Sequence, residues 1–244
     1  MYDRDTLIDR EGRVAVTDIV VSADHVSRNF GIGEAAITVI HDCSLDVHAG
    51  TILAIIGKSG SGKSTLCNLL SGLDRPSSGK IRLLGHDPAA IGDAKLAELR
   101  ATRIGFVLQK DNLVPSLTIE ENVAAPLIFG GMKIKRARER AREYLERVGL
   151  AHRATAWPSY VSGGEAQRAA VARACVTQPE IIFADEPTGA LDSENGERVA
   201  ELFRTMVTEH GAAGVLVTHD SDLAAIADET IHLTDGRITS GVEV

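Results

Sequence analysis

The feature that most limits the fold of this chain is a short apolar run that leads directly into a glycine-rich segment. Residues 52–56 are all apolar, and residues 57–65 then read G-K-S-G-S-G-K-S-T. This segment fits the pattern G-x-x-x-x-G-K-[ST], which stands between a strand and a helix wherever it is functional. A strand, a glycine-rich loop and a helix in this order predict an α/β core.

The same segment predicts a phosphate-binding loop. Its glycines let backbone N–H groups turn toward phosphate oxygens, and the positive end of the following helix adds to the attraction. We expect the Lys63 side chain to reach the β- and γ-phosphates and the Ser64 hydroxyl to bind Mg²⁺. A plain Gly/Ser turn would not explain a lysine at that position. The candidate nucleotide-binding residues of the loop are Gly57, Lys58, Ser59, Gly60, Ser61, Gly62, Lys63, Ser64 and Thr65.

A second apolar run, residues 181–184, ends in the adjacent carboxylates Asp185 and Glu186. Magnesium prefers oxygen ligands, so Asp185 is a candidate metal ligand. Glu186 is then a candidate general base for the water that attacks a phosphate. Strands that end in acidic residues are common, and this pair gains its meaning only together with the phosphate loop.

A second glycine-bearing turn begins a predicted helix at Ser162, Gly163, Gly164 and Glu165. Ser162 and Glu165 have the spacing of a capping box, but a capping box does not explain the glycine pair. Exposed amides and a serine hydroxyl at a helix start also favour a phosphate. The two interpretations are compatible.

Helical and strand patterns alternate along the rest of the chain, which predicts a parallel sheet flanked by helices. We divide the chain into an N-terminal extension (1–18) and one domain (19–240), with a helical subdomain inserted at about 111–160. Predicted strands cover 19–21, 37–40, 52–56, 81–84, 104–108, 181–185, 214–218 and 230–233. Predicted helices cover 63–72, 93–102, 118–127, 133–149, 163–177, 193–210 and 220–227.

Composition excludes several classes of protein. The 244 residues carry a net charge of −8, which argues against a nucleic-acid partner. No apolar run approaches the roughly 18–20 residues of a membrane span, and the charged N-terminus does not read as a secretory signal. The three cysteines form no paired motif, which fits a reducing cytosol. The basic run 133–142 has glutamates interleaved in and around it, which favours a solvated helix over a surface for nucleic acid or anionic lipid.

Taken together, the motifs make residues 19–240 resemble the ATP-binding subunit of an ABC transporter. The phosphate loop, Gln109, the signature 161–165, Asp185-Glu186, residues 190–192 and His219 stand in that family's order. The resemblance implies an α/β fold: a P-loop NTPase core with a parallel sheet, an antiparallel N-terminal β-subdomain and a helical subdomain. It also implies ATP hydrolysis, with ATP and Mg²⁺ as cofactors.

Roles for single residues follow from the resemblance. Phe30 looks like the aromatic residue that stacks on adenine, where the family more often has Tyr. Gln109 looks like the residue that contacts Mg²⁺ and signals to the helical subdomain, and His219 looks like the γ-phosphate switch. Two copies are implied to pack head to tail, so that Ser162, Gly163 and Gly164 complete the partner's site while Asp192 crosses the interface. The signature reads VSGGE, not the commoner LSGGQ, and Glu165 thus brings a carboxylate toward the partner's nucleotide.

Residues 112–123 and 186–192 resemble one branch in particular, that of macrolide exporters and lipoprotein-release complexes. This branch implies a transmembrane permease partner and a place on the cytoplasmic face of the membrane. The expected function is export or mechanical extraction of a hydrophobic or amphipathic cargo; the alternative is a non-transport ATPase that drives a membrane partner in cell division. Candidates for an apolar docking patch, or else for the core of the subdomain, are Leu113, Val114, Pro115, Leu117 and Phe129.

Overall fold

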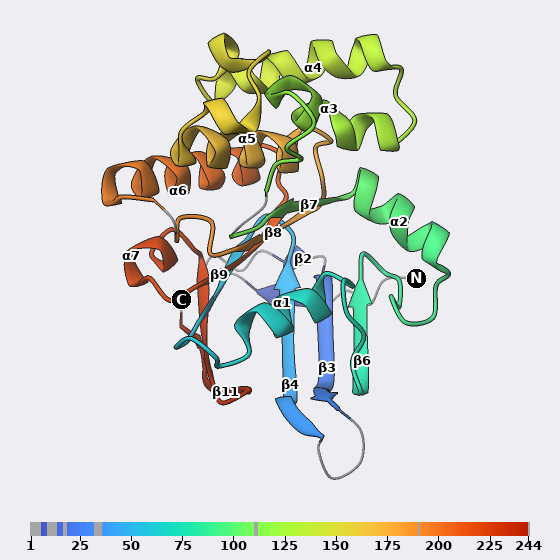
Figure 1. Ribbon diagram of the computed structural model, residues 1–244. Helices are drawn as coiled ribbons and strands as arrows, with labels where there is room; N and C mark the ends of the chain where they lie inside the picture. The colour runs from blue at the N-terminus through green and yellow to red at the C-terminus, as the bar shows by residue number, and fades with distance from the viewer. Residues whose placement is uncertain are drawn as a thin grey trace.

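Two β-sheets of different type lie on either side of one helix (Figure 1). The structure, a computed structural model, describes residues 6–8, 14–16, 19–31, 36–109, 112–189 and 191–243. The larger sheet has the strand order β11-β10-β5-β9-β8-β7 and is parallel except for the β10–β11 pair at its edge. Its strands are β5 (Ile52–Ile56), β7 (Ile104–Val107), β8 (Ile181–Asp185), β9 (Ala213–Thr218), β10 (Glu229–Thr234) and β11 (Arg237–Glu243).

The smaller sheet is antiparallel and is built mainly from the first part of the chain. Its order is β4-β3-β6, with β3 (Ile19–Phe30), β4 (Ile37–His48) and β6 (Ser78–Leu83). Helix α1 (Lys63–Leu70) contacts strands of both sheets. The predicted combination of a parallel core sheet with an antiparallel N-terminal sheet is therefore confirmed.

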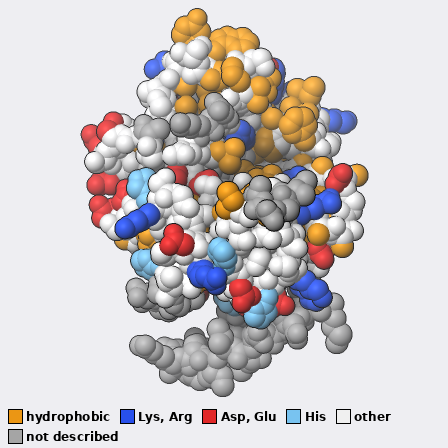
Figure 2. All heavy atoms as spheres, turned by 60° about the horizontal axis from the view of Figure 1, so that its bottom comes forward, with side chains coloured by type: hydrophobic (Ala, Val, Ile, Leu, Met, Phe, Trp, Pro, Cys, Tyr) orange, Lys and Arg blue, Asp and Glu red, His pale blue; other side chains and the backbone are white. Residues whose placement is uncertain are grey.

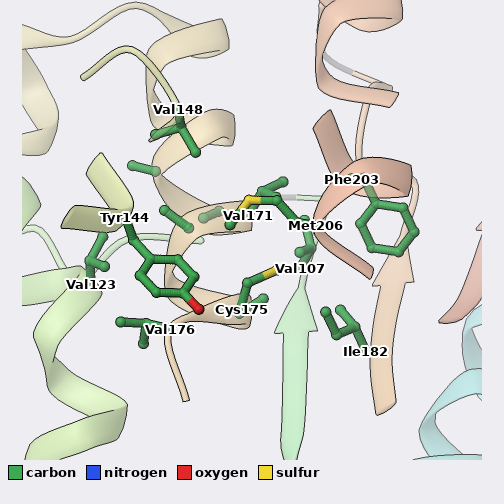
Figure 3. Close-up of a cluster of buried hydrophobic side chains, with 14 of the residues drawn as sticks. Val107, Val123, Tyr144, Val148, Val171, Cys175, Val176, Ile182, Phe203 and Met206 are labelled. Carbon is green, nitrogen blue, oxygen red and sulfur yellow. The ribbon is translucent and has the colours of Figure 1, made fainter. Parts of the chain in front are cut away.

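Both faces of the parallel sheet are buried, which explains why its strands read as continuous apolar runs. Alternate residues of β8 enter different cores: Ile182 packs under the helices shown in Figure 3, and Phe183 packs on the opposite face. Side chains of β9 divide in the same way, with Leu216 on the first face and Val215 on the second. This two-sided burial fixes the register of the strands whose ends carry the candidate site.

The helices gather mainly on one side of the parallel sheet, at the top of Figure 1. Helices α3, α4 and α5 pack against one another, and α5 also contacts α6 and β7. Thr118 begins α3 with the predicted capping box to Glu121. The helices are α2 (Asp93–Thr102), α3 (Ile119–Phe129), α4 (Ile134–Arg147), α5 (Gly163–Cys175), α6 (Ser193–Thr208) and α7 (Ser221–Ala224), with the 3-10 turns η2 (Ala151–Arg153) and η3 (Pro158–Tyr160).

Buried amide side chains hold the loop between β7 and α3. Asn112 accepts a hydrogen bond from the Leu108 backbone N–H (2.7 Å) and donates one to Gln167 on α5 (3.0 Å). Asn122 accepts from the Val114 N–H (2.7 Å) and donates to three backbone carbonyls of the same loop. These bonds satisfy backbone groups that would otherwise be buried without partners, and they tie the segment after Gln109 to the helices.

The structure departs from the sequence prediction in four places. Residues 1–18 contain two short paired strands, β1 (Thr6–Ile8) and β2 (Val14–Val16), where none was predicted. The strands β3 and β4 are much longer than predicted, and β11 was missed. Helix α7 has four residues instead of the predicted eight, because the chain turns back into the sheet at Asp228, which accepts a hydrogen bond from the Ile52 N–H. In the part of the chain that is described, no helix has the length and apolar character to cross a membrane.

Candidate nucleotide-binding site

The glycine-rich loop joins the end of β5 to the start of α1, as predicted. Gly62 begins the helix with φ of +100°, a conformation that other residues rarely adopt. A Cβ atom on Gly57 would lie 2.3 Å from the Leu233 carbonyl oxygen of β10. Glycine is thus required at both ends of the loop: at Gly62 for its backbone conformation and at Gly57 for close packing against β10.

Lys63 is buried although it carries a charge. Its Nζ atom donates to the Gly57 carbonyl (2.8 Å) and to the Lys58 carbonyl (3.1 Å), so the side chain folds back across its own loop. Both hydrogen-bond acceptors are neutral, and the nearby Asp185 carboxylate also attracts the ammonium. Together with the free N–H groups of the helix start, this arrangement attracts a phosphate.

The two carboxylates at the end of β8 have different surroundings. Burial raises the pKa of Asp185, and a hydrogen bond from Ser64 opposes that shift. The Oδ1 atom of Asp185 is buried without a hydrogen-bond partner. A buried carboxylate oxygen with an open coordination position and an adjacent hydroxyl are suitable ligands for a hard cation. Among the described residues no cluster of three or more His, Cys, Asp or Glu side chains could hold a metal.

Glu186 stands in a strained backbone conformation, with φ of +47°. Such conformations cost about 1–3 kcal/mol and concentrate at functional sites. Its Oε1 lies 2.7 Å from Nδ1 of His219, and its Oε2 accepts a weaker hydrogen bond from the Thr218 hydroxyl (3.4 Å). The Glu186 side chain is only 12% exposed, so its carboxylate has a fixed position at the wall of the cleft.

A single cleft of about 1250 Å³ brings most of the predicted residues together. The whole loop 57–65, Gln109, Glu186 and His219 line it. The Gln109 amide nitrogen also lies 3.3 Å from the position of a Cβ on Gly189, so this side chain faces the turn that follows Glu186. The cleft has further lining residues that the sequence did not indicate: Val39, Ile56, His232, Leu233, Thr234 and Asp235.

The residues from the β10–β11 turn were missed because β11 was not recognised. The T-D-G sequence at 234–236 is a turn signal, and reading it as a hairpin would have placed this turn beside a strand end. The turn also supports the loop directly. Gly236 donates its N–H to the Ser61 carbonyl (2.9 Å), and its own carbonyl accepts from the His41 N–H (2.8 Å).

The signature residues do not line this cleft. Ser162 caps α5 through the predicted box: its hydroxyl accepts from the Glu165 N–H (3.2 Å), and Glu165 accepts from the Ser162 N–H (2.8 Å). The other Glu165 oxygen accepts from Nε of Arg153 (2.9 Å). The Ser162 N–H and Arg153 lower the pKa of Glu165. Its charge is thus paired within the chain, which reduces the repulsion that a free carboxylate would bring to a neighbouring nucleotide.

Three other predicted residues also lie outside the cleft lining: Asp185, described above, Phe30 and Asp192. Phe30 ends β3, pairs with Ile37 on β4 and is 43% exposed. Asp192 caps α6 by accepting from the Asn195 N–H (2.9 Å). A Cβ on Gly164 would lie 3.1 Å from the Asn195 side chain, so the signature helix and the start of α6 are neighbours. Ala190 lies outside the described residues.

With this geometry in view, the chain was compared with known proteins. The family profile described as ABC transporter matches residues 40–189, more than half of the chain. This chain belongs to the ABC transporter family. The predicted resemblance and fold class are thereby confirmed, and the chain is an ABC ATPase that binds and hydrolyses ATP.

Relatives of this ABC ATPase include exporters and a release system. The chain is 44% identical over 214 residues to the macrolide export ATP-binding/permease protein MacB of Salmonella choleraesuis, and the match covers 88% of the chain but only 33% of MacB. It is 43% identical to the lipoprotein-releasing system ATP-binding protein LolD of Shewanella oneidensis, covering 91% of the chain and 96% of LolD. A dimeric post-hydrolysis structure of the ATP-binding cassette MJ0796 with ADP and Pi superposes with a TM-score of 0.84 at 38% identity, covering 91% of this chain and 97% of that one.

Proposed function

We propose that this chain is the ATPase subunit of a transporter whose membrane-crossing part is a separate permease, and that it powers export or mechanical extraction of a hydrophobic or amphipathic cargo. The observation that carries the proposal is the nearly end-to-end match to a lipoprotein-releasing ATP-binding protein. The match to the ATP-binding third of a macrolide exporter supports the same direction. In this function the chain works at the cytoplasmic face of the membrane.

In the proposed reaction, Lys63 and the backbone N–H groups of the loop hold the β- and γ-phosphates of ATP. Ser64 and Asp185 hold Mg²⁺, which neutralises phosphate charge when bound, with Gln109 at the edge of the same site. Glu186 accepts the proton of the attacking water. His219 orients the Glu186 carboxylate through the 2.7 Å contact. Because His219 also lines the cleft, its imidazole can leave Glu186 and contact the γ-phosphate instead.

We further propose that two copies pack head to tail. The signature residues Ser162, Gly163, Gly164 and Glu165 begin α5 outside the chain's own cleft, and Ser162 and Gly163 are exposed. A helix N-terminus in this position can meet the nucleotide of another copy. The dimeric state of the structurally similar cassette MJ0796 supports this arrangement.

This arrangement predicts a concentration dependence. Because one chain lacks a complete site, its ATPase rate should rise more steeply than linearly with protein concentration until dimers saturate. Steady-state rates from nanomolar to micromolar protein, with the mass measured in parallel by light scattering, check this. A strictly linear rate at concentrations where only monomers exist would contradict it.

For the permease we propose a docking groove between the helical subdomain and the parallel sheet. A groove of about 250 Å³ is lined by Phe106, Val114, Pro126 and Phe129 among others. Val114 is 46% and Phe129 78% exposed, whereas Leu113 is buried in the core of the subdomain. Hydrophobic side chains gather on the upper part of the face shown in Figure 2. An apolar patch of this kind beside the segment that follows Gln109 fits a cytoplasmic helix of the permease.

The groove is tested by replacing apolar side chains at its rim. Phe129→Ser and Val114→Ser should each reduce co-purification with the permease severalfold, because they remove apolar area from the contact, while the ATPase activity of the isolated cassette stays unchanged. Ile134→Ser is the matched control, since Ile134 is also an exposed apolar residue but does not line the groove. Equal retention of the permease by all three variants would place the docking surface elsewhere.

A further inference from the structure

One arginine covers the ring of Phe30. The guanidinium carbon of Arg28 stands 4.5 Å from the centroid of the Phe30 ring, well within the range of a cation–π contact. Phe30 nevertheless remains 43% exposed. One face of the ring is therefore occupied, while part of the residue remains accessible to solvent.

Arg28 is itself held in place by a bidentate ion pair. Its Nε donates to Oδ2 of Asp74 (2.8 Å) and its Nη2 donates to Oδ1 (2.9 Å), and both side chains are partly buried. Forked pairs of this kind fix the orientation of the guanidinium as well as its position. The Phe30 ring thus rests on a support that cannot rotate freely.

Asp74 connects this support to the phosphate loop. It follows helix α1, to which its backbone N–H is bonded at the Asn68 carbonyl (3.0 Å), and α1 begins at Lys63. The segment that follows α1, residues 74–77, is joined to β3 by two further hydrogen bonds. The Ser77 N–H donates to the Ser27 carbonyl (2.8 Å), and the Asn29 N–H donates to the Ser77 hydroxyl (3.0 Å). The position of the ring is therefore linked, through one helix, to the position of the loop.

The strand position of Phe30 lies near the nucleotide cleft. Phe30 pairs with Ile37, and Val39, two residues further along β4, lines the cleft. Two strand residues span about 7 Å, a separation that a nucleoside bridges when its phosphates lie in the loop.

We infer that Arg28 is a positioning residue for the nucleobase: clamped by Asp74, it fixes Phe30 as a one-sided platform on which adenine stacks. The inference rests on the proposed ATPase function and on the role that the family resemblance implies for Phe30, the residue that meets adenine. A ring that is already immobilised loses little conformational freedom when the base binds. Arg28 touches neither phosphate nor metal in this arrangement, so its effect is confined to the base.

The test compares two probes on the full chain, ATP and inorganic tripolyphosphate, by titration calorimetry. Arg28→Ala should weaken ATP binding about three- to tenfold, the size expected from losing a partly buried cation–π support, and leave tripolyphosphate binding within twofold. Phe30→Ala should weaken ATP binding at least as much, again without affecting tripolyphosphate. In the double variant the Arg28 change should add nothing, because the platform it supports is gone.

Controls separate positioning from a general loss of structure. Arg82→Ala removes an exposed arginine from β6 of the same sheet and should change neither affinity. Asp74→Asn and Arg28→Lys, which preserve most of the packing, should each reproduce part of the ATP-specific loss and remain informative if Arg28→Ala does not fold. Equal weakening of both probes by these variants would overturn the inference. If Phe30→Ala weakened ATP binding selectively and the Arg28 variants did not, the inference would also be overturned, but the contact between Phe30 and the base would stand. If Phe30→Ala caused no selective loss of ATP binding, the base contact itself would be rejected.

Discussion

Glu186→Gln is expected to bind ATP with unchanged affinity and to hydrolyse it about 10²–10⁴-fold more slowly than the unaltered chain, the contribution typical of a positioned general base. The amide is nearly isosteric with the carboxylate, so the strained turn and the Thr218 contact can be kept. What the variant loses is the ability to accept the proton of the attacking water. Single-turnover hydrolysis, with nucleotide affinity measured separately, checks both halves of the expectation.

The control for this change is Glu194→Gln. Glu194 is an exposed acid in the first turn of α6, paired with Arg198, and it does not line the cleft. The Glu194→Gln variant should hydrolyse ATP at the rate of the unaltered chain. If Glu186→Gln did the same, the assignment of Glu186 as general base would be wrong.

Lys63→Met should lower the affinity for ATP about a hundredfold or more. In the ATP complex the Lys63 ammonium and the phosphates form a buried charge pair, and removing one member of such a pair costs about 2–5 kcal/mol or more. In the variant the phosphates would face a thioether in place of the ammonium. The apolar side chain has a similar volume. In the chain without nucleotide it gives up hydrogen bonds to the Gly57 and Lys58 carbonyls and the attraction to Asp185. The melting temperature should therefore change little without nucleotide, and the increase that ATP normally produces should disappear.

Lys58→Met is the matched change for that experiment. Lys58 lies in the same loop and lines the same cleft, but its side chain is exposed and only its backbone carbonyl contacts Lys63. Its ATP affinity should fall only a few-fold, through long-range attraction. Equal losses in the two variants would mean that net positive charge, and not the position of Lys63, binds the phosphates.

The features that the sequence predicted correctly are local ones. The loop 57–65 and the strand before it are defined by apolar residues and glycine spacing within a dozen positions. The capping boxes at Thr118 and Ser162 are encoded by residues three apart, and both are present in the structure. Asp185 and Glu186 could be placed at the carboxyl ends of the parallel strands because a buried strand leads directly to them.

The features that were missed depend on contacts between distant segments. The polar strand β11 has no clear apolar alternation, and it becomes a strand by pairing with β10. The cleft residues of the β10–β11 turn are part of the site only because β10 lies next to β5. Likewise, no spacing rule connects Arg28 with Asp74, since 46 residues separate them. Local patterns therefore predict the reactive groups, whereas the packing around them requires the structure.

The position of β5 in the sheet has a consequence for how the protein is made. The strand that carries the phosphate loop pairs with β9 on one side and β10 on the other, and the loop is held by Gly236. All of these partners lie beyond residue 212, whereas the loop is complete at residue 65. During synthesis, which delivers the N-terminal part first, the nascent chain therefore carries the phosphate-binding sequence long before it carries the strands that shape it. The nucleotide site can therefore take its shape only after residues 213–236 have been made, well after the phosphate loop itself.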